Sequence, residues 1–136
     1  SFVFAFLTLF ASCSVPNLES SDCTAARSEL KKLYSIHFDR GFEPDEQYRS
    51  ERDRFLTQEL AGKIDGSGET DYLTGTIDHP KAFRIGSCAE SGTDKLTFGI
   101  LLFWKDDTRN EQKRIEAAMK RTGDEWKLDS VETLKR

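Results

Sequence analysis

The sequence predicts an α+β fold in which N-terminal helices pack on a curved antiparallel sheet of three to four strands. Three observations lead to this prediction. Apolar residues recur at helical spacing over residues 23–64, and from Lys81 onward they alternate with polar residues. A polar, Gly-rich stretch, Asp65–Thr76, separates the two halves. Helices followed by strands are typical of the α+β class, and the folded part, residues 23–136, has the length of a single domain.

The residues that precede this domain have the composition of an export signal. No charged residue occurs before Glu19, and Phe2–Ala11 is apolar except for Thr8. Ten helical residues span about 15 Å, half of a bilayer core, which is too short for an ordinary transmembrane helix and suits the apolar part of a secretory signal. We therefore expect a signal peptide over residues 1–12.

The end of the apolar run and the residues that follow it, Leu9–Cys13, resemble a bacterial lipobox, in which small residues precede a cysteine that is diacylated and becomes the mature N-terminus. On this interpretation Cys13 carries the lipid, and residues 13–22 form the lipidated N-terminus and a flexible tether. Ser14 after the cysteine then favours the outer membrane of a Gram-negative cell. The alternative is a plain signal peptide that is cut near Ser12 or Ser14. Both interpretations predict a protein of the cell envelope, on its periplasmic side.

The two cysteines that remain, Cys23 and Cys88, are predicted to form a disulfide, because exported proteins fold in oxidising compartments. Such a cross-link stabilises a small domain by about 4 kcal/mol in the chain-entropy model. The alternative is a pair of buried free thiols. No metal site and no cofactor are expected, since His37 and His79 lack the short paired spacings of metal ligands.

Residues Cys23–Phe38 are predicted to form the first helix, with Ser21 or Asp22 as its N-cap. A second helix is expected to begin at Asp45-Glu46, and Phe55–Ile64 is a candidate for a separate short helix. The apolar stripe of the first helix consists of Ala26, Leu30, Leu33, Tyr34, His37 and Phe38.

The second half of the chain is predicted to form the sheet. Ala82–Ala89 alternates polar and apolar residues, and Lys95–Lys105 is apolar on both faces, which marks a central strand. Glu111–Arg121 has the composition of a helix, but a tight turn connects it to the alternating segment Glu125–Glu132. We therefore predict that both of these segments are strands.

Several local motifs carry a resemblance to a known family. They are the Phe55–Leu60 segment, the Asp78-x-Pro80 step and the closing strand Gly123–Asp129, together with the long first helix. These features resemble the nuclear-transport-factor-2-like superfamily, whose fold is a cystatin-like cone. More narrowly, the chain is similar to a bacterial family of small exported lipoproteins of unknown function. The resemblance covers about Cys23–Val131 and leaves the activity open, because one fold serves many functions.

Enzymes of this superfamily, such as ketosteroid isomerase, place Asp, His or Tyr inside the cone. The resemblance therefore makes Asp78, His79, Tyr34 and His37 the candidate catalytic residues, because an Asp beside a His can work as an acid–base pair. Against this, Asp78-His79-Pro80 is typical of a turn that leads into a strand. His37 lies at the edge of an apolar stripe, where a histidine is more often a satisfied core residue. We therefore predict that the protein is not an enzyme.

The net charge of the chain limits the kinds of molecule that it can bind. With 24 acidic and 20 basic residues the formal charge is −4, which argues against nucleic acid as a ligand. The prediction is a non-catalytic envelope lipoprotein, anchored to the membrane through Cys13, that binds a protein or a small apolar ligand through its cone or its sheet face. Two alternatives remain: a small hydrolase, isomerase or dehydratase that uses an Asp/His pair, and an immunity-type inhibitor of a toxin. A monomer or weak dimer is expected because the strand faces are charged at Lys113, Arg114, Glu116, Lys120 and Lys127.

Overall fold

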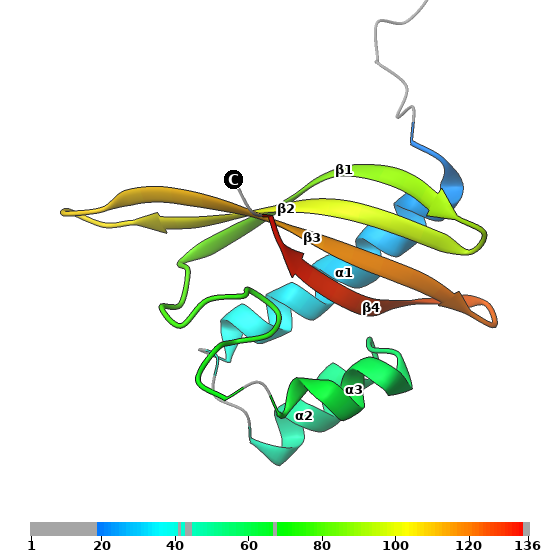
Figure 1. Cartoon of the computed structure of the whole chain (residues 1–136), viewed down its shortest axis with the longest axis horizontal. Coiled ribbons are helices and arrows are strands. Elements are labelled where there is room, and N and C mark those ends of the chain that lie inside the picture. The colour runs from blue at the N-terminus through cyan, green and yellow to red at the C-terminus, as the bar shows by residue number, and fades with distance from the viewer. Residues whose placement is uncertain (1–18, 41, 43–44, 67, 135–136) are drawn as a thin grey trace, which may run out of the picture.

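The computed structural model describes residues 19–40, 42, 45–66 and 68–134. The predicted signal peptide, residues 1–12, and Cys13 lie outside the described residues. In the described chain three helices precede four strands (Figure 1), which is the predicted order. The elements are α1 (Ser21–Asp39), α2 (Glu46–Asp53), α3 (Gln58–Ile64), β1 (Ala82–Gly92), β2 (Lys95–Lys105), β3 (Asn110–Thr122) and β4 (Glu125–Thr133).

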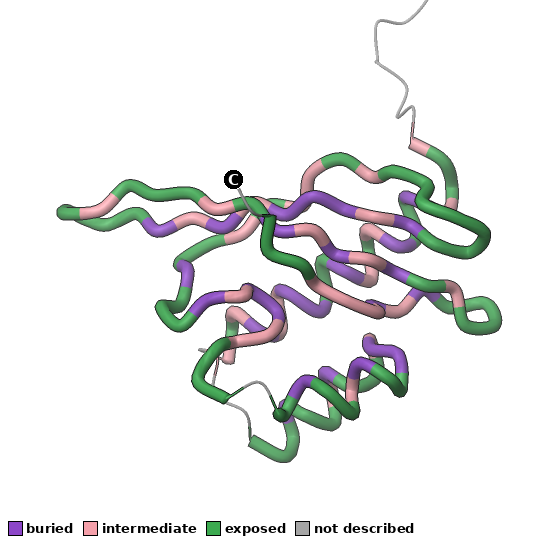
Figure 2. The backbone as a smooth tube through the Cα atoms, in the orientation of Figure 1, coloured by how far each residue is buried: buried purple, intermediate pink, exposed green. Residues whose placement is uncertain are grey.

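The long helix α1 begins at Ser21, ahead of its apolar stripe, and its N-cap is Ser20. The Ser20 side chain accepts a hydrogen bond from the backbone N–H of Cys23 at 3.1 Å, which satisfies one of the free donors of the first turn. The prediction of Ser21 or Asp22 as the cap is therefore wrong, since both residues are already helical. The predicted apolar stripe is the buried side of the helix, which lies against the sheet (Figure 2).

The two short helices also begin at residues whose side chains cap them. Asp45 accepts a hydrogen bond from the N–H of Tyr48 at 2.7 Å, and Thr57 accepts one from the N–H of Leu60 at 3.3 Å. The helix expected within Phe55–Ile64 is thus a separate element that begins after Thr57.

The segment between α2 and α3 covers one edge of the sheet. The N–H of Thr57 donates to the carbonyl of Leu128 at 2.9 Å, and the N–H of Leu128 donates to the carbonyl of Phe55 at 2.8 Å. The Thr57 hydroxyl also donates to the Asp129 carboxylate at 2.9 Å. Because these bonds occupy backbone groups along β4, that strand does not present a fully open edge.

The strands form one antiparallel sheet in the order β1-β2-β3-β4, so each strand pairs with its neighbour in sequence. The central strand β2 buries alternate side chains from Leu96 to Trp104 beneath the helices. The segment Glu111–Arg121 lies within β3, as the turn argument predicted, and its pairing with β2 and β4 outweighs its helix-favouring composition.

A β-bulge interrupts the pairing of β1 between Ile85 and Cys88. The guanidinium of Arg27 donates to the carbonyls of Ile85 and Gly86, at 3.2 and 2.7 Å, and it forms an ion pair with the Glu19 carboxylate. The bulge therefore leaves two carbonyls that α1 satisfies, and this contact fixes the N-terminal end of α1 on β1.

Cys23 and Cys88 form the predicted disulfide, with 6.1 Å between their Cα atoms. It joins the first turn of α1 to the bulged part of β1 and spans 65 positions of sequence. The Glu19 carboxylate lies near both sulfur atoms, but neither sulfur is a thiolate that could bind a metal ion.

The core lies between α1 and the inner face of the sheet and is filled by large side chains (Figure 2). Its fully buried members include Leu30, Leu33, Tyr34, Phe98, Ile100, Leu102, Ile115 and Met119. Within the described residues, none of the helices combines the length and the apolar character needed to cross a bilayer. The architecture is therefore the predicted α+β fold, with helices on one side of a curved antiparallel sheet.

Candidate functional site

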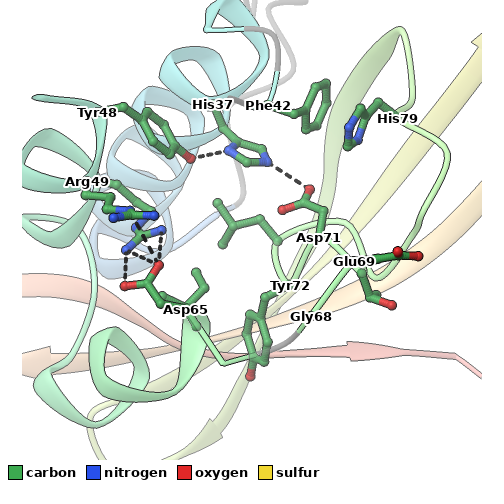
Figure 3. Close-up of a pocket in the computed structure, with 14 residues that line it drawn as sticks. His37, Phe42, Tyr48, Arg49, Asp65, Gly68, Glu69, Asp71, Tyr72 and His79 are labelled. Carbon is green, nitrogen blue, oxygen red and sulfur yellow. Dashed lines mark hydrogen bonds and ion pairs between the residues drawn. The ribbon is translucent and has the colours of Figure 1, made fainter. Parts of the chain in front are cut away.

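A polar cavity of about 380 Å³ lies where the C-terminal part of α1 meets α2 and the segment that follows α3 (Figure 3). Each of the three parts contributes one residue to a continuous set of hydrogen bonds: His37 from α1, Tyr48 from α2 and Asp71 from the segment after α3. The cavity is the candidate functional site because it gathers several titratable side chains from separate parts of the sequence.

His37 is at the centre of this set, and both of its ring nitrogens have partners. Nδ1 is hydrogen-bonded to the Tyr48 hydroxyl, and Nε2 lies 2.8 Å from the Asp71 carboxylate. Tyr48 and His37 are almost completely buried, with 1% and 4% of their surface exposed. A neutral imidazole protonated on Nε2 satisfies both bonds, since it donates to the carboxylate and accepts from the tyrosine.

Asp71 is held by a tight turn of its own chain. Its backbone N–H donates to the carbonyl of Thr76 at 2.9 Å, and its carbonyl accepts from the N–H of Gly75 at 2.7 Å. The Thr74 hydroxyl donates to the same carboxylate oxygen that His37 contacts, at 2.8 Å. Gly75 has a positive φ of 67°, and a Cβ there would lie 2.5 Å from Oγ1 of Thr133, so the turn needs glycine at this position.

The electrostatic environment keeps the tyrosine neutral and the carboxylate ionised. Burial by itself would raise the pKa of Asp71. The hydrogen bonds that its carboxylate accepts from His37 and Thr74 lower the pKa by more, so that it lies below its ordinary value of 3.8. Burial raises the pKa of the Tyr48 hydroxyl well above its ordinary value of 10.0, against the opposing effect of the Arg52 charge. At neutral pH Tyr48 is therefore a donor and Asp71 is an acceptor.

The wall of the cavity next to Tyr48 contains a buried arginine, Arg52, whose guanidinium carbon lies 5.7 Å from the centre of the Tyr48 ring. The Arg52 side chain is 5% exposed and forms ion pairs with Asp53 at 3.0 Å and Asp65 at 3.3 Å. Arg49 lies 3.9 Å from the same Asp65 carboxylate. The cationic groups of this wall are therefore already neutralised by acidic side chains of the chain itself.

The four candidate catalytic residues have separate environments. The Tyr34 hydroxyl is fully buried and donates to the carbonyl of Leu73. Asp78 is exposed and forms an ion pair with Arg109. His79 is also exposed. The structure therefore places Asp78 and His79 apart from the His37 hydrogen bonds, although His37 and His79 both line the cavity.

The ring of His79 stacks on Phe42, with 4.3 Å between the ring centroids and 3° between their planes. Phe42 also packs edge-on against His37, at 4.6 Å. One phenyl ring therefore lies between the exposed histidine and the buried one, and all three residues line the cavity (Figure 3).

Sequence reasoning did not identify Asp71 or Tyr48 as site residues. Asp71 lies in the Gly-rich stretch before the strands, and 34 positions separate it from His37. Tyr48 occupies an apolar position of a short helix, where an aromatic residue is usually part of the core. The available signal was His37 itself, since a buried histidine requires partners for both ring nitrogens.

The arrangement is better suited to holding segments together than to transferring protons. Both nitrogens of His37 and one oxygen of Asp71 are occupied by groups of the protein. A substrate would have to replace one of these hydrogen bonds before either residue could act as an acid or a base. The hydrogen bonds instead connect α1, α2 and the segment after α3 at the end of the helix layer.

No family model matches the sequence, and no curated protein matches it. Solved structures do share its fold. One chain of the type VI native effector-immunity complex Tae3-Tai3 from Ralstonia pickettii superposes with a TM-score of 0.62 at 13% identity, over 81% of this chain and 95% of that one. A protein of unknown function from Bacteroides thetaiotaomicron gives a TM-score of 0.57 at 13% identity, over 79% and 88% of the two chains.

A third similar structure is an Ntf2-like protein involved in plasmid conjugation, with a TM-score of 0.54 at 13% identity. It matches 85% of this chain but only 40% of its own length. At these identities the likeness concerns the fold alone. This chain thus shares its α+β fold with an Ntf2-like protein, which bears out the resemblance for the fold alone.

Proposed function

We propose that this chain is a non-catalytic, lipid-anchored protein of the cell envelope that acts by binding another protein. The observation that carries the proposal is the set of hydrogen bonds around His37. The one His–Asp pair in the cavity, His37 and Asp71, is held in hydrogen bonds among α1, α2 and the segment after α3. The fold also occurs in one chain of an effector-immunity complex, so it can take part in a protein assembly.

A protein partner is favoured over a small apolar ligand by the distribution of polar groups. The space between α1 and the sheet is filled by the side chains of the core. The cavity at the end of the helix layer is lined by charged residues such as Arg52, Asp65 and Asp71. An apolar molecule would therefore displace core side chains or remove water from charged groups, and both are unfavourable.

The envelope part of the proposal rests on the sequence and on the disulfide. The lipobox-like segment Leu9–Ser12 precedes Cys13, and the Cys23–Cys88 bond is typical of proteins in oxidising compartments. The finer form of the proposal is a member of the exported lipoprotein family that the sequence resembles, anchored in the outer membrane where the host is Gram-negative.

The anchor is tested by labelling cells with a radioactive or clickable fatty acid. We expect label on the wild-type protein and on Ser14→Ala, and none on Cys13→Ala. Intact-mass measurement of the native protein completes the test. A mature N-terminus at or after Ser14, or an unmodified Cys13, would contradict lipid anchoring and would support a plain signal peptide.

Protein binding is tested by cross-linking the full-length tagged protein in its native host and identifying the products by mass spectrometry. We expect a specific partner that is retained when the purified proteins are mixed. If that partner is an enzyme whose activity the purified protein inhibits, the immunity-type form of the proposal gains support. A substrate screen that finds turnover abolished by His37→Gln would contradict the non-catalytic assignment.

A further inference from the structure

The face of the sheet that points away from the helices is uncovered in the described chain. α1 packs on β1, β2 and β4, and α3 packs on β4, all from the same side (Figure 1). The strand register identifies the side chains that point the other way, and we call this surface the outer face. Its charged members are the six cations Arg84, Lys95, Lys105, Arg114, Lys120 and Lys127 and the three acids Glu116, Glu125 and Glu132.

Within the described residues, five of the six outer-face cations have no acidic partner, whereas most arginines elsewhere do. Arg27, Arg52 and Arg109, on other surfaces, each form ion pairs. In the part of the chain that the structure describes, Lys127 is the one outer-face cation with an ion pair, to Glu125 at 3.9 Å. The outer face is therefore net positive and largely unneutralised, although the whole chain has a charge of −4.

The outer face also has a partly apolar centre on which the two arginines lie. Phe103 is half-buried on β2, and the Arg84 guanidinium is 5.9 Å from the centre of its ring. Arg114 lies across Gly99, because a Cβ built on that glycine would be 3.0 Å from Nη2 of the arginine. Both guanidinium groups are thus supported by the sheet, which lowers the entropy that binding would cost.

We propose that the outer face is the surface through which this protein binds its partner, and that the partner presents an acidic surface with an apolar centre. The inference rests on the proposed protein-binding function and adds the location and the chemistry of the contact. Arginine is one of the residue types that contribute most binding energy in protein interfaces, and aromatic residues are enriched at the centre of such interfaces. An excess of unpaired cations attracts and orients an acidic partner.

Two other occupants fit the outer face less well. A second copy of this chain would bring two net-positive faces together, which is repulsive. An anionic membrane would attract the cations, but Glu116 and Glu132 lie opposite each other on β3 and β4, where they would face the lipid phosphates. A protein surface can place a cation against this acidic pair, whereas a uniformly anionic surface cannot.

The location is tested by photo-cross-linking in the native host. Benzoylphenylalanine is placed in the full-length protein at Thr97 or Gln112, on the outer face, and at Ser28 or Glu59, which are exposed on the helix layer. We expect adducts with one acidic protein from the first two positions and not from the others. Adducts with a protein only from Ser28 or Glu59 would overturn the outer-face assignment and leave the proposed function intact.

The chemistry of the contact is tested by calorimetric titration of this protein with the purified partner that cross-linking has identified. The outer-face variant, Arg84→Glu with Arg114→Glu and Lys120→Glu, is expected to bind at least about tenfold more weakly than the wild type. The wild-type affinity is also expected to fall as NaCl is raised from about 50 to about 300 mM. Circular dichroism and thermal melting establish that the variant is folded, since its three positions are exposed.

A matched control carries the same change in net charge on the helix layer. The helix-layer variant, Lys31→Glu with Arg54→Glu and Lys63→Glu, alters exposed cations that form no ion pair within the described residues. It is expected to bind the partner with wild-type affinity to within about twofold. Equal weakening by both variants would overturn the proposal, because the effect would then come from the overall charge.

The same variants also test whether a membrane or a second copy of this chain occupies the outer face. Outer-face adducts with lipid or with another molecule of this chain, in place of a different protein, would overturn the proposal. The proposal would also be overturned if Cys13→Ala floated with phosphatidylglycerol vesicles and the substitutions of the outer-face variant abolished this flotation. The absence of protein adducts from all four cross-linker positions would overturn the protein-binding function and this inference together.

Discussion

At the scale of single residues, the hydrogen bonds of His37 link segments that the chain order keeps apart. The ring joins α1 to Tyr48 on α2 and to Asp71 after α3. Because the His37 side chain is 5% exposed, water cannot replace a lost partner, and an unsatisfied buried donor is more unfavourable than the net value of a hydrogen bond.

The substitution Asp71→Asn is expected to lower the free energy of unfolding by about 1–3 kcal/mol, because it removes the charge that accepts hydrogen bonds from His37 and Thr74. Urea denaturation at neutral pH measures the change. The control is Asp78→Asn, whose carboxylate forms an exposed ion pair with Arg109 and whose loss is expected to alter stability by less than about 1 kcal/mol. Similar effects of the two variants would contradict a structural role for the His37 hydrogen bonds.

The same variant is expected to change how stability depends on pH. The pKa of Asp71 is lowered in the folded state, so its contribution is present above the ordinary value of 3.8 and is lost as the pH falls through the lower folded value. Wild-type stability should therefore decrease more steeply than that of Asp71→Asn as the pH is lowered from about 5 to about 3. Parallel curves in urea denaturation over this range would show that Asp71 is not the group responsible.

Gly75 and Gly68 provide a second residue-scale prediction, since both have positive φ angles near 70° but different surroundings. Nothing lies within 4 Å of a Cβ built on Gly68, whereas one built on Gly75 meets Thr133. Gly68→Ala is expected to destabilise by about 1 kcal/mol from the backbone alone, and Gly75→Ala by more. Thr133→Ala in the Gly75→Ala background should reduce the difference; a double variant that is no more stable than Gly75→Ala would refute the contact.

The site residues show where sequence reasoning reaches its limit. His37 was a candidate because the superfamily that the sequence resembles includes enzymes with Asp, His or Tyr inside the cone, and the structure places it in the candidate site. Its partner Asp71 lies in a polar turn whose sequence is equally typical of a solvent-exposed loop. Periodicity describes positions within one element, so it cannot reveal a hydrogen bond between a helix and a loop 34 positions away.

At the scale of elements, the disulfide fixes α1 to the sheet at the bulge of β1. Replacing both Cys23 and Cys88 by Ala is expected to lower the free energy of unfolding by about 4 kcal/mol, because the cross-link restricts a long loop in the unfolded chain. The measurement is guanidinium denaturation of the variant, with the wild type in the presence and absence of reductant. A change below about 1 kcal/mol would indicate that the bond contributes little to the folded domain.

The elements were more predictable than the site because most of them depend on local signals. Three strands follow from alternation and short turns, and β2 follows from a run that is apolar on both faces. The informative case is β3, since its composition favours a helix and its neighbours decide otherwise. The details that failed are terminal ones, such as the cap at Ser20, because several adjacent polar residues can cap equally well. The bulge in β1 left no signal that distinguished it from regular alternation.

At the scale of the whole molecule, the placement of all described helices on one side of the sheet leaves the outer face as a broad surface without a cover (Figure 2). A sheet face with half-buried Leu101 and Phe103 favours association, whereas its unpaired cations oppose association with an identical face. The oligomeric state therefore depends on which of these two effects is larger.

We expect charge repulsion to outweigh apolar association, so that the wild type sediments as a monomer at about 50 mM NaCl. Replacing Arg84, Arg114 and Lys120 by glutamine leaves equal numbers of cations and anions on the outer face. Without the repulsion, the apolar centre should promote self-association at the same salt concentration. The wild type should also associate weakly at about 1 M NaCl, where charges are screened over about 3 Å.

The control for this prediction is glutamine at Lys31, Arg54 and Lys63, which makes the same change in net charge on the helix layer. Because those side chains are outside the outer face, the control variant should remain a monomer in sedimentation experiments. A wild-type dimer at low salt that dissociates as salt is added would show that oppositely charged groups attract the two copies. In that case the cations of the outer face would be interface residues of a homodimer, and acidic side chains of the second copy would be their partners.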